Sequence, residues 1–528
     1  MYEKLIVTPQ RAGIVLGTAF ALAAIHQYLF YDHTYGISYP MFVILFYLYM
    51  YIYAGDCLRR GSWFSRLFTT VIILLSLTYG WFANGFFYVL NMLVVPGLIS
   101  LHMAYMLSYR RPNWARMYIV YAALEHVLLQ LPAHLPTPLR MLYRKAAGRM
   151  QQQHKRIAGK ILLGLLCALP LLIIIIGLLS SADGMFQQML IHVPDWLPRL
   201  SFTEGTLRLV WIVMMGFILF AYVWGFIQPY RRQSLSSSLV ADQPASDSAA
   251  GATIPSASPA HDWHIDQPNA AYPPLVMPRL DPIMLATVLV VINLVYLLFV
   301  SLQFSYLFGA GQGYLPDGST YAEYARSGFG ELVLVTGLNF VILLSALYGS
   351  VKAGVGLHRL NQFLLLILVV CSAVMLCSAF MRLLMYEQAY GYTVIRFLVH
   401  AFMLFLGVLL VLAGLRIYMS RLPLIHCYIV FGLISYVLVN YIGMDRIIAE
   451  RNIQRYEQTG ELDQDYLLTL SPGAIPMLLR FSYEHQLPEL RKRLHTDNEY
   501  VVTRHASWQE YNWETHRAIQ QLRLDRPL

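Results

Sequence analysis

A chain of 528 residues in which 57% of the residues are hydrophobic and 13% are charged, with a mean hydropathy of +0.52, lies outside the range of soluble proteins, which carry about 25% charged residues. Its net charge of +9 is spread over many loops without a basic stripe. Positive loops on the cytoplasmic side of a membrane account for this charge, so we expect no nucleic-acid partner.

Apolar runs of about 20 residues recur along the chain, and each is long enough to cross a hydrocarbon layer about 30 Å thick. Lipid offers no hydrogen-bond partner to an open sheet edge, and the runs lack the alternation of barrel strands, so we expect helices in a lipid bilayer. The predicted fold is an all-α polytopic membrane helix bundle. Its eleven predicted spans are 12–31, 36–54, 67–83, 86–108, 161–180, 208–228, 282–307, 332–351, 361–381, 395–415 and 424–443.

Lysine and arginine residues in the loops predict how the chain crosses the membrane. With the N-terminus in the cytoplasm, the cytoplasmic segments hold 22 of them and the external loops hold five, while eleven follow residue 445. Short cytoplasmic loops are enriched in Lys and Arg, whereas long segments are exempt from this rule. We therefore expect a cytoplasmic N-terminus and an extracytoplasmic C-terminus. The first helix is expected to be retained rather than cleaved.

Changes in composition divide the chain into four parts. Residues 1–230 form a first membrane half of about six spans, and residues 281–444 form a second half of about five. Residues 231–280 are rich in Ser, Ala, Pro and Asp without an apolar period, which predicts a disordered cytoplasmic linker. Residues 445–528, here called the tail, are helical in pattern and predict a small extracytoplasmic helical domain.

The basic cytoplasmic loop 109–160 has a pattern of its own. It combines basic residues such as Arg140 and Arg144 with regularly spaced leucines. This pattern fits an amphipathic helix on the inner leaflet, broken between Pro132 and Pro138. A solvated basic loop is the alternative.

The tail contains several predicted helix boundaries. "NIQRYEQTG" ends at Gly460, a predicted C-cap, and in "LSPGAIPMLL" Ser471 is a predicted N-cap with Pro472 at the first helical position. Later leucines at spacings of three and four predict further short helices. Trp508 and Trp513 fit either the core of this domain or a contact with the membrane.

The stretch "STYAEYARSGFGEL", residues 319–332, concentrates polar residues between two apolar runs. Thr320 and Glu323 have capping-box spacing, which predicts a short helix at the outer membrane surface. Tyr321 fits an aromatic belt, and Glu323 with Arg326 fits an exposed ion pair. A working site is the alternative.

The next external loop, "RLLMYEQAYGYTVIR" at residues 382–396, adds two arginines on the side where positive residues are scarce. Gly391 is expected to end one helix, which places Arg396 in the first turn of the next, where a cation is disfavoured. Each arginine therefore needs a partner, and Glu331 and Glu387 are the carboxylates at similar depth.

These loops predict a polar cluster at the outer rim, which works either as a functional site or as a latch of ion pairs between the two halves. Polar residues inside the spans, such as Asn293, Asn339 and His400, fit hydrogen bonds between helices. The candidate members of the outer cluster are Asp183, Tyr321, Glu323, Arg326, Glu331, Arg382, Tyr386, Glu387, Tyr392 and Arg396.

Sequence motifs of common enzymes are missing. The chain contains no phosphate-binding loop, no zinc-protease motif and no serine-hydrolase motif. The five cysteines form neither a disulfide framework nor a C-x-x-C pattern. We therefore expect no metal and no cofactor, and an enzyme is not the favoured class.

Four motifs, "SADGMF", "YAEYARSGFGEL", "RLLMYEQAYGYTVIR" and "NIQRYEQTGELDQDYLLTLSPGAIP", together resemble an uncharacterised family of multi-pass bacterial membrane proteins, defined by a domain of unknown function. The matching pieces run from about residue 160 to 480. The last motif adds Asn452, Arg455 and Tyr456 to the candidate residues. An acidic residue often follows its Ser-Pro in the family, whereas Gly473 stands here. The resemblance implies a bacterial cytoplasmic-membrane protein and brings no activity, substrate or cofactor.

Three functions remain open on these observations. The first is an envelope sensor or assembly protein, whose tail and outer cluster bind an envelope protein or a cell-wall component. The second is a transporter or lipid flippase, with a pathway between the two halves that reaches Asn293, Asn339 and His400. The third is an enzyme acting on a lipid-linked substrate, with Glu331 or Glu387 as its base. The first is the favoured prediction.

Overall fold

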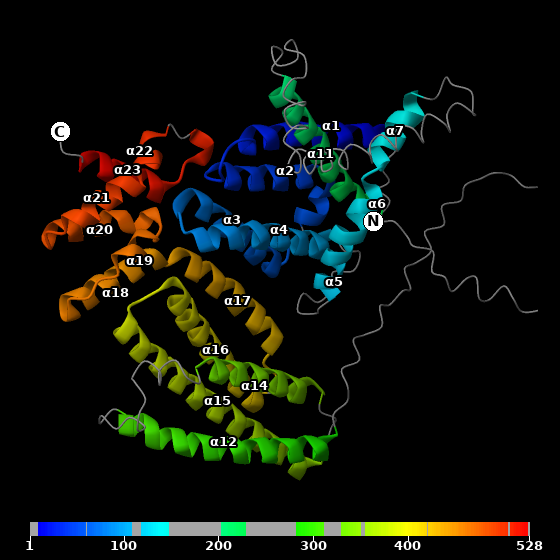
Figure 1. Ribbon diagram of the computed structural model, residues 1–528. Coiled ribbons are helices and arrows are strands. Elements are labelled where there is room, and N and C mark those ends of the chain that lie inside the picture. Colours follow the sequence, from blue (N-terminus) through cyan, green and yellow to red (C-terminus); the bar gives the residue numbers. More distant parts are fainter. Residues whose placement is uncertain are drawn as a thin grey trace, which may run out of the picture. The chain divides into compact units, whose positions relative to one another are not determined.

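The computed structural model describes residues 9–59, 61–107, 118–146, 202–228, 281–310, 329–349, 354–419, 421–504 and 507–525. All regular elements in these residues are helices (Figure 1). The long ones are α1 (Pro9–Phe30), α2 (Ser38–Arg59), α3 (Trp63–Trp81), α4 (Gly85–Leu107), α11 (Phe202–Ile227), α12 (Pro282–Ala310), α14 (Phe329–Gly349), α15 (Val355–Tyr390), α16 (Val394–Tyr418) and α17 (Leu424–Tyr441).

Two groups of shorter helices complete the described chain. The first, between α4 and α11, consists of α5 (Tyr118–Glu125), a π-helical turn (His126–Gln130), α6 (Leu131–His134) and α7 (Thr137–Ala146). The second forms the tail. It consists of α18 (Met444–Thr459), α19 (Gln464–Leu468), a 3₁₀ turn (Pro472–Ala474), α20 (Ile475–Glu484), α21 (Pro488–Asp497), α22 (Glu499–Thr503), a 3₁₀ turn (Trp508–Glu510) and α23 (Trp513–Leu524).

The all-α membrane bundle is confirmed. Nine described helices are long and apolar enough to cross a membrane, and α2 contains a shorter apolar helix, Ser38–Tyr53. Ten of the eleven predicted spans therefore coincide with helices, although α15, with 36 residues, is much longer than predicted. The predicted span 161–180 and the predicted linker 231–280 lie outside the described residues, so the count of eleven stays a prediction.

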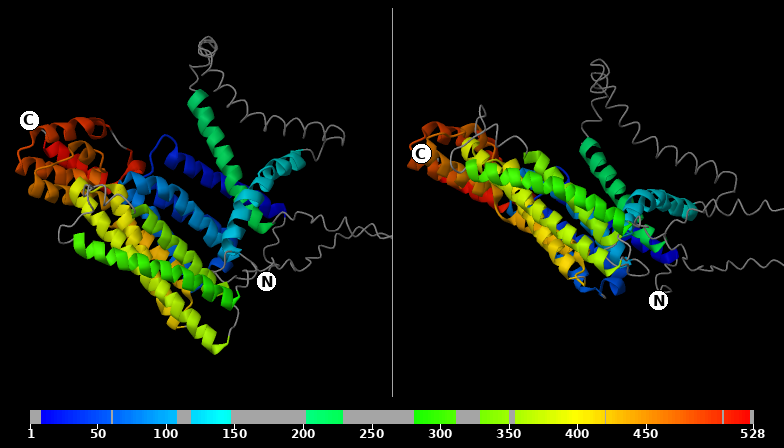
Figure 2. Two further views of the ribbon diagram at one scale, coloured as in Figure 1. Left: turned by 60° about the horizontal axis from the view of Figure 1, so that its bottom comes forward. Right: turned by 90° about the horizontal axis from the view of Figure 1, so that it is seen from below.

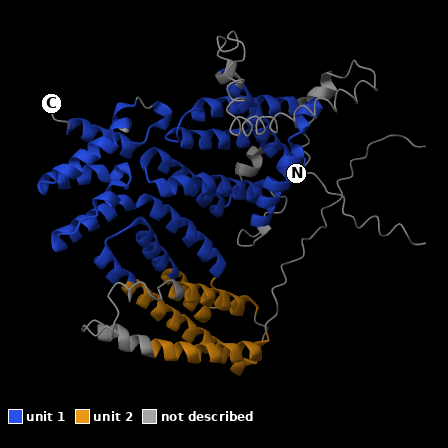
Figure 3. Ribbon diagram, viewed as in Figure 1, with its two compact units in different colours: residues 1–230, 383–406, 423–528 blue, residues 231–382, 407–422 orange. Residues whose placement is uncertain are grey.

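The chain forms two compact units (Figure 3). Helices α15 and α16 each contribute residues to both units. Unit 1 consists of residues 1–230, 383–406 and 423–528, and unit 2 consists of residues 231–382 and 407–422.

Small residues bring α1 and α11 close together in unit 1. Ala19 and Ala23 of α1 are fully buried in one core cluster with Phe220 of α11 and Met50 of α2. In lipid the hydrophobic effect does not drive helices together, so their association depends on close van der Waals packing. Small side chains allow this because they let the two helix backbones approach each other closely. A second cluster, centred on Ile72 of α3, joins α3 and α4 to α17.

Buried amides connect the spans of unit 1, as the sequence predicts. Asn91 of α4 donates to the Asn440 side chain of α17 at 2.7 Å and to the Thr78 hydroxyl of α3 at 3.1 Å, while it accepts from Tyr436 at 2.7 Å. These bonds satisfy polar groups that lipid would leave without partners. They hold α3, α4 and α17 in one register.

The loop 109–160 contains the predicted helical segment. Its helices α5, α6 and α7 follow one another across the ends of α4 and α11, at the end of unit 1 opposite the tail (Figures 1 and 2). The chain turns at Leu135 and Pro136, within the interval where the break is predicted.

The tail has an apolar core of its own. Helix α18 ends at Gly460, whose backbone has φ +74° and whose N–H donates to the Tyr456 carbonyl at 2.8 Å, so the predicted C-cap is confirmed. Ser471 precedes Pro472 at the start of a 3₁₀ turn that leads into α20. The buried core residues include Leu467, Leu478, Leu490, Leu494 and Leu522.

Unit 2 is built from α12, α14 and parts of α15 and α16. Its core contains Leu289, Leu343 and Leu368, all almost fully buried. Asn339 of α14 accepts from Tyr296 at 2.7 Å and donates to Ser372 at 2.8 Å. This amide therefore connects three helices of the unit.

Candidate functional site

The predicted site residues are distributed between the described and undescribed parts of the chain. Asp183, Tyr321, Glu323 and Arg326 lie outside the described residues, and only the helical backbone of Glu331 is described. Arg382 is a partly buried residue of α15 that belongs to unit 2. Unit 1 brings most of the others together where α15 ends and α16 begins, at residues 386–396, here called the turn site. The turn site contains Tyr386, Glu387, Tyr392 and Arg396, and Asn452 and Arg455 of α18 contact it.

Gly391 ends α15, as the sequence predicts. Its φ of +80° lies in the left-handed region, and its N–H donates to the Glu387 carbonyl at 2.8 Å. A Cβ added here would lie 2.7 Å from Oδ1 of Asn452. Only glycine therefore fits both the backbone conformation and the close approach of α18.

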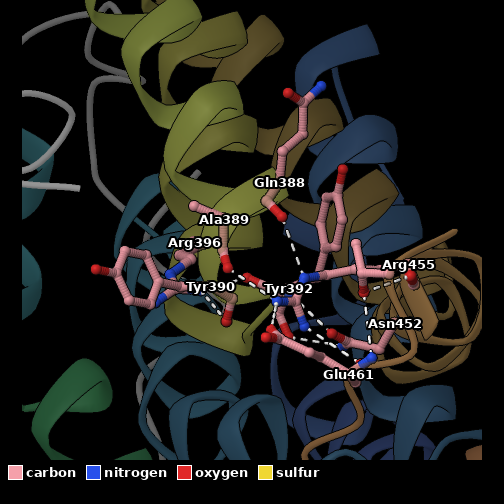
Figure 4. A network of polar contacts seen from close by, with 10 residues as sticks. Gln388, Ala389, Tyr390, Tyr392, Arg396, Asn452, Arg455 and Glu461 are labelled. Carbon is pink, nitrogen blue, oxygen red and sulfur yellow. Dashed lines mark hydrogen bonds and ion pairs between the residues drawn. The ribbon is translucent and has the colours of Figure 1, made fainter. Parts of the chain in front are cut away.

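Asn452 of α18 binds the backbone of the turn site. Its Oδ1 accepts from the Tyr392 N–H at 3.0 Å, and its Nδ2 donates to the Tyr392 carbonyl at 2.8 Å (Figure 4). The same Nδ2 donates to the Ile448 carbonyl at 2.9 Å, which fixes the amide on its own helix. One side chain thus satisfies both polar groups of a residue between two spans.

Arg455, one turn further along α18, binds the end of α15. Its guanidinium donates to the carbonyls of Gln388 at 3.1 Å and Ala389 at 2.8 Å, and to the Glu461 carboxylate at 2.7 Å (Figure 4). The last carbonyls of a helix have no partner within the helix and carry partial negative charge, so a cation there is favourable.

Arg396 lies in the first turn of α16, but its partners differ from the predicted carboxylates. Its Nη1 donates to the Tyr390 carbonyl at 3.2 Å and to the Gly391 carbonyl, and its guanidinium lies 4.3 Å from the centre of the Tyr386 ring. The negative end of α15 and an aromatic face thus compensate the unfavourable dipole of α16. This arginine fastens the two helix ends to each other.

Glu387 is paired with histidine. Its Oε1 lies 3.1 Å from Nδ1 of His400 on α16, and the residue is only 1% exposed. A carboxylate this deeply buried requires a hydrogen-bonded partner. The pair joins α15 to α16 inside unit 1, about two turns into α16.

Two tyrosines of the tail lie near the turn site with different roles. Tyr466 of α19 accepts from the Val394 N–H at 2.8 Å, which supplies a partner to the first backbone donor of α16. Burial raises the pKa of the Tyr466 hydroxyl, so it stays protonated. Tyr456 instead packs edge-on against Phe481, with ring centres 5.4 Å apart, and belongs to the tail core.

A second contact between tail and loops was not predicted from the sequence. Asn512, the N-cap of α23, donates to the carbonyls of Tyr79 at 2.9 Å and Phe82 at 2.8 Å at the end of α3. Glu514 accepts from the Ala83 N–H at 2.9 Å. Asn is a common N-cap residue. Its presence before α23 therefore gave no reason to expect a contact with α3.

Two carboxylates lie in this second contact. Asp445, 5% exposed, accepts from the Asn84 side chain at 2.6 Å, and it lines a small pocket together with Glu514 and Gly473. Burial raises the pKa of the Glu514 carboxyl, and the Asp445 carboxylate raises it further, against the Ala83 N–H and Arg517.

Gly473, the departure from the resembled motif, lies directly against Glu514. A Cβ at Gly473 would be 2.6 Å from Oε1 of Glu514. The carboxylate of Glu514 therefore occupies the space beside the Ser-Pro segment, close to the position after the Ser-Pro.

The loop between α1 and α2 also contacts the tail. Ile37 donates its N–H to the Tyr511 carbonyl at 3.0 Å, and the Thr34 N–H donates to the Glu510 carboxylate at 3.0 Å. Arg504 pairs with the same carboxylate at 3.0 Å.

Among the described residues, no group of three or more His, Cys, Asp or Glu side chains forms a metal-binding cluster.

The family model described as "Domain of unknown function (DUF4153)" matches residues 69–481. The chain belongs to this family. No curated protein and no solved structure gave a match.

The DUF4153 match extends from within α3 to α20 and begins well before the motifs that first suggest the resemblance. It includes the turn site together with Asn452 and Arg455. It ends before Asn512 and Glu514, so the matched region includes the end of α3 but not the α23 residues that bind it.

Proposed function

We propose that this integral membrane protein is a sensor or assembly protein of the cell envelope, and that its tail binds an envelope protein or a cell-wall component. The observation that carries the proposal is the way the tail attaches to unit 1. Asn452, Arg455, Asn512 and Glu514 all bind backbone groups at the ends of spans or in the loops between them. A partner that displaces the tail therefore removes hydrogen bonds from the ends of membrane helices.

The loops that the tail contacts support one topology for this proposal. They join α1 to α2, α3 to α4, and α15 to α16. In the predicted eleven-span arrangement all three are external, and so is the tail. The proposed location is a bacterial cytoplasmic membrane, with the N-terminus cytoplasmic and the tail outside. A reporter fused after Leu528 that is active only in the cytosol would overturn this part of the proposal.

The tail also presents aromatic side chains that suit a protein partner. Tyr500 of α22 is 70% exposed and Tyr483 of α20 is 57% exposed. Exposed tyrosines are enriched among residues that dominate binding energy at interfaces. The polar residues of unit 2 that would line a transport pathway, in contrast, bind neighbouring helices: Asn293 donates to the Leu364 carbonyl at 2.8 Å.

Complementation of a deletion strain tests the proposal. Tyr500→Ala and Tyr483→Ala together are expected to leave the abundance of the full-length protein in the membrane unchanged and to abolish complementation. Leu524→Ala, at an exposed apolar residue of α23, is the matched control and is expected to complement. Full complementation by the double tyrosine variant contradicts a role of this tail surface in partner binding.

A further inference from the structure

The helices that follow α4 have two distinct faces. The buried face contains Ile119, Ala123 and His126, each no more than 6% exposed. The opposite face carries large apolar side chains that are exposed by 37% to 64%: Val120, Tyr121, Leu124, Val127, Leu128 and Leu129. A contiguous exposed apolar surface of this kind marks a site where a membrane or another protein segment covers it.

The buried face fixes the direction in which the apolar face points. His126 lies 2.9 Å from the Tyr222 carbonyl of α11, and its ring stacks on Phe226 with centres 3.6 Å apart. At Gly225 a Cβ would lie 2.9 Å from the His126 ring, so glycine allows the close approach. These contacts hold α5 and the π-helical turn against α11, with the leucines facing away.

The same segment carries an exposed cation further along the chain, in α7. Leu131 and Met141 pack against the core cluster of α1, α2 and α11, which anchors α6 and α7. Arg140 of α7 is exposed next to this anchor. Helices with an apolar face and basic residues lie in the boundary between headgroups and acyl chains, and anionic lipids strengthen their binding.

We propose that residues 118–141 form a lipid-binding surface that lies in the plane of the membrane and prefers anionic phospholipids. The apolar face enters the acyl region of the leaflet at this end of unit 1, and Arg140 contacts the headgroups. Two observations identify lipid as the occupant. The segment packs against the span α4, whose Val89 and Leu93 are exposed, as lipid-facing residues are. It also runs across the ends of α4 and α11 rather than along them (Figure 2).

Spin-label accessibility tests the apolar face. The full chain, with its native cysteines replaced, carries a nitroxide at Leu124→Cys or Leu128→Cys in lipid nanodiscs, with Tyr500→Cys on the tail as the exposed control. Collisions with oxygen are expected to exceed collisions with a water-soluble nickel complex at both helix positions, and the order is expected to reverse at the control. High nickel accessibility at Leu128 overturns the proposal, because it means a solvated loop. Low accessibility to both reagents also overturns it, because another protein segment or a second copy then covers the face.

Lipid retention tests the preference for anionic headgroups. The protein is purified from mixed anionic and zwitterionic lipid, and the ratio of the two lipids that remain bound is measured. One cation near an anionic surface contributes about 1 kcal/mol, so Arg140→Gln is expected to lower this ratio about fivefold. Arg480→Gln, at an exposed arginine of α20, is the matched control and is expected to leave it unchanged. An equal ratio in wild type and Arg140→Gln overturns the role of Arg140.

Discussion

Asn452 binds both backbone polar groups of Tyr392, accepting from its N–H at 3.0 Å and donating to its carbonyl at 2.8 Å. This arrangement reproduces the pairing of one strand residue with another, although no strand is described in unit 1. It places a side-chain amide of the tail against the short link between α15 and α16. At such a position the backbone groups have no partner within a helix, so the tail supplies what the turn lacks.

Replacement of this amide is expected to destabilise the turn site strongly. Asn452→Ala leaves two partly buried backbone groups without partners, which costs about 2 to 4 kcal/mol. The expected result is a lower melting temperature of the purified full-length protein and faster proteolysis near residue 392. Asn452→Asp is the informative comparison, because it keeps the acceptor for the Tyr392 N–H and replaces the donors by a carboxylate oxygen that faces the Tyr392 and Ile448 carbonyls. Equal losses in the two variants would contradict the role given to the bond from the Tyr392 N–H, and an Asn452→Asp variant as stable as wild type would contradict the role given to the carbonyl bond.

Two glycines in left-handed conformations allow the contact at Gly391 to be measured separately from backbone strain. Gly460 has φ +74° with no atom within 4 Å of an added Cβ, whereas at Gly391 the Cβ meets Asn452 at 2.7 Å. Gly460→Ala should therefore cost only the left-handed penalty of about 1 to 2 kcal/mol. Gly391→Ala should cost clearly more than that.

A double-mutant cycle checks this difference. Because alanine at 452 removes the atom that clashes, Gly391→Ala combined with Asn452→Ala should be less destabilised than the sum of the single variants. Melting temperatures in one detergent give the four values. Strict additivity would show that the close approach seen at Gly391 does not determine its requirement for glycine.

The end of α15 provides a third prediction. Arg455→Lys keeps the positive charge but loses the fork that reaches the carbonyls of Gln388 and Ala389 together, so both Arg455→Lys and Arg455→Ala should be destabilised, by about 1 to 3 kcal/mol. Melting temperatures again provide the measurement. Arg493→Lys, at an exposed arginine paired with Asp465, is the control and should change stability little. If Arg455→Lys matches wild type, the helix dipole alone accounts for this arginine.

The sequence predicted the elements well because local signals determine them. Apolar length predicted ten helices, Gly391 and Gly460 predicted two helix ends, and the spacing of leucines predicted the tail helices. Tyr392 and Arg396 were candidates because polar residues between apolar runs are conspicuous, and Asn452 and Arg455 were candidates because of the resemblance of the tail motif to the family. The structure places these four residues close together, and their role as a functional site stays a prediction.

The partners of these residues were not predictable in the same way. The sequence suggested that Arg396 pairs with a carboxylate, whereas its partners are backbone carbonyls, which every residue possesses and no sequence pattern marks. Asn512 and Glu514 were missed for a related reason. Their partners lie more than 400 residues earlier, at the end of α3, and are again backbone groups. The two tryptophans of the tail, for which both a core and a membrane contact were open, are 47% and 43% exposed, so neither is buried in the core.

Glu514 gives a pH-dependent prediction. Its pKa is raised, mainly by burial and further by Asp445, so the folded state favours the protonated carboxyl more than the unfolded state does. Its contribution to stability is therefore fully present below the unfolded pKa of the carboxyl and is lost as the pH rises through the raised folded value. Glu514→Gln retains an oxygen that accepts from the Ala83 N–H and removes the charge. The variant should be more stable than wild type at neutral pH, and this advantage should disappear below the ordinary range of a carboxyl.

Melting temperatures measured across this range test the sign of the effect. Glu484→Gln, at an exposed carboxylate of α20 paired with Arg480, is the matched control and should not gain stability at neutral pH. A lower stability of Glu514→Gln at neutral pH would mean that the ionised carboxylate binds the Ala83 N–H strongly enough to outweigh its burial. In that case the contact between α23 and the end of α3 would strengthen, rather than weaken, as the pH rises.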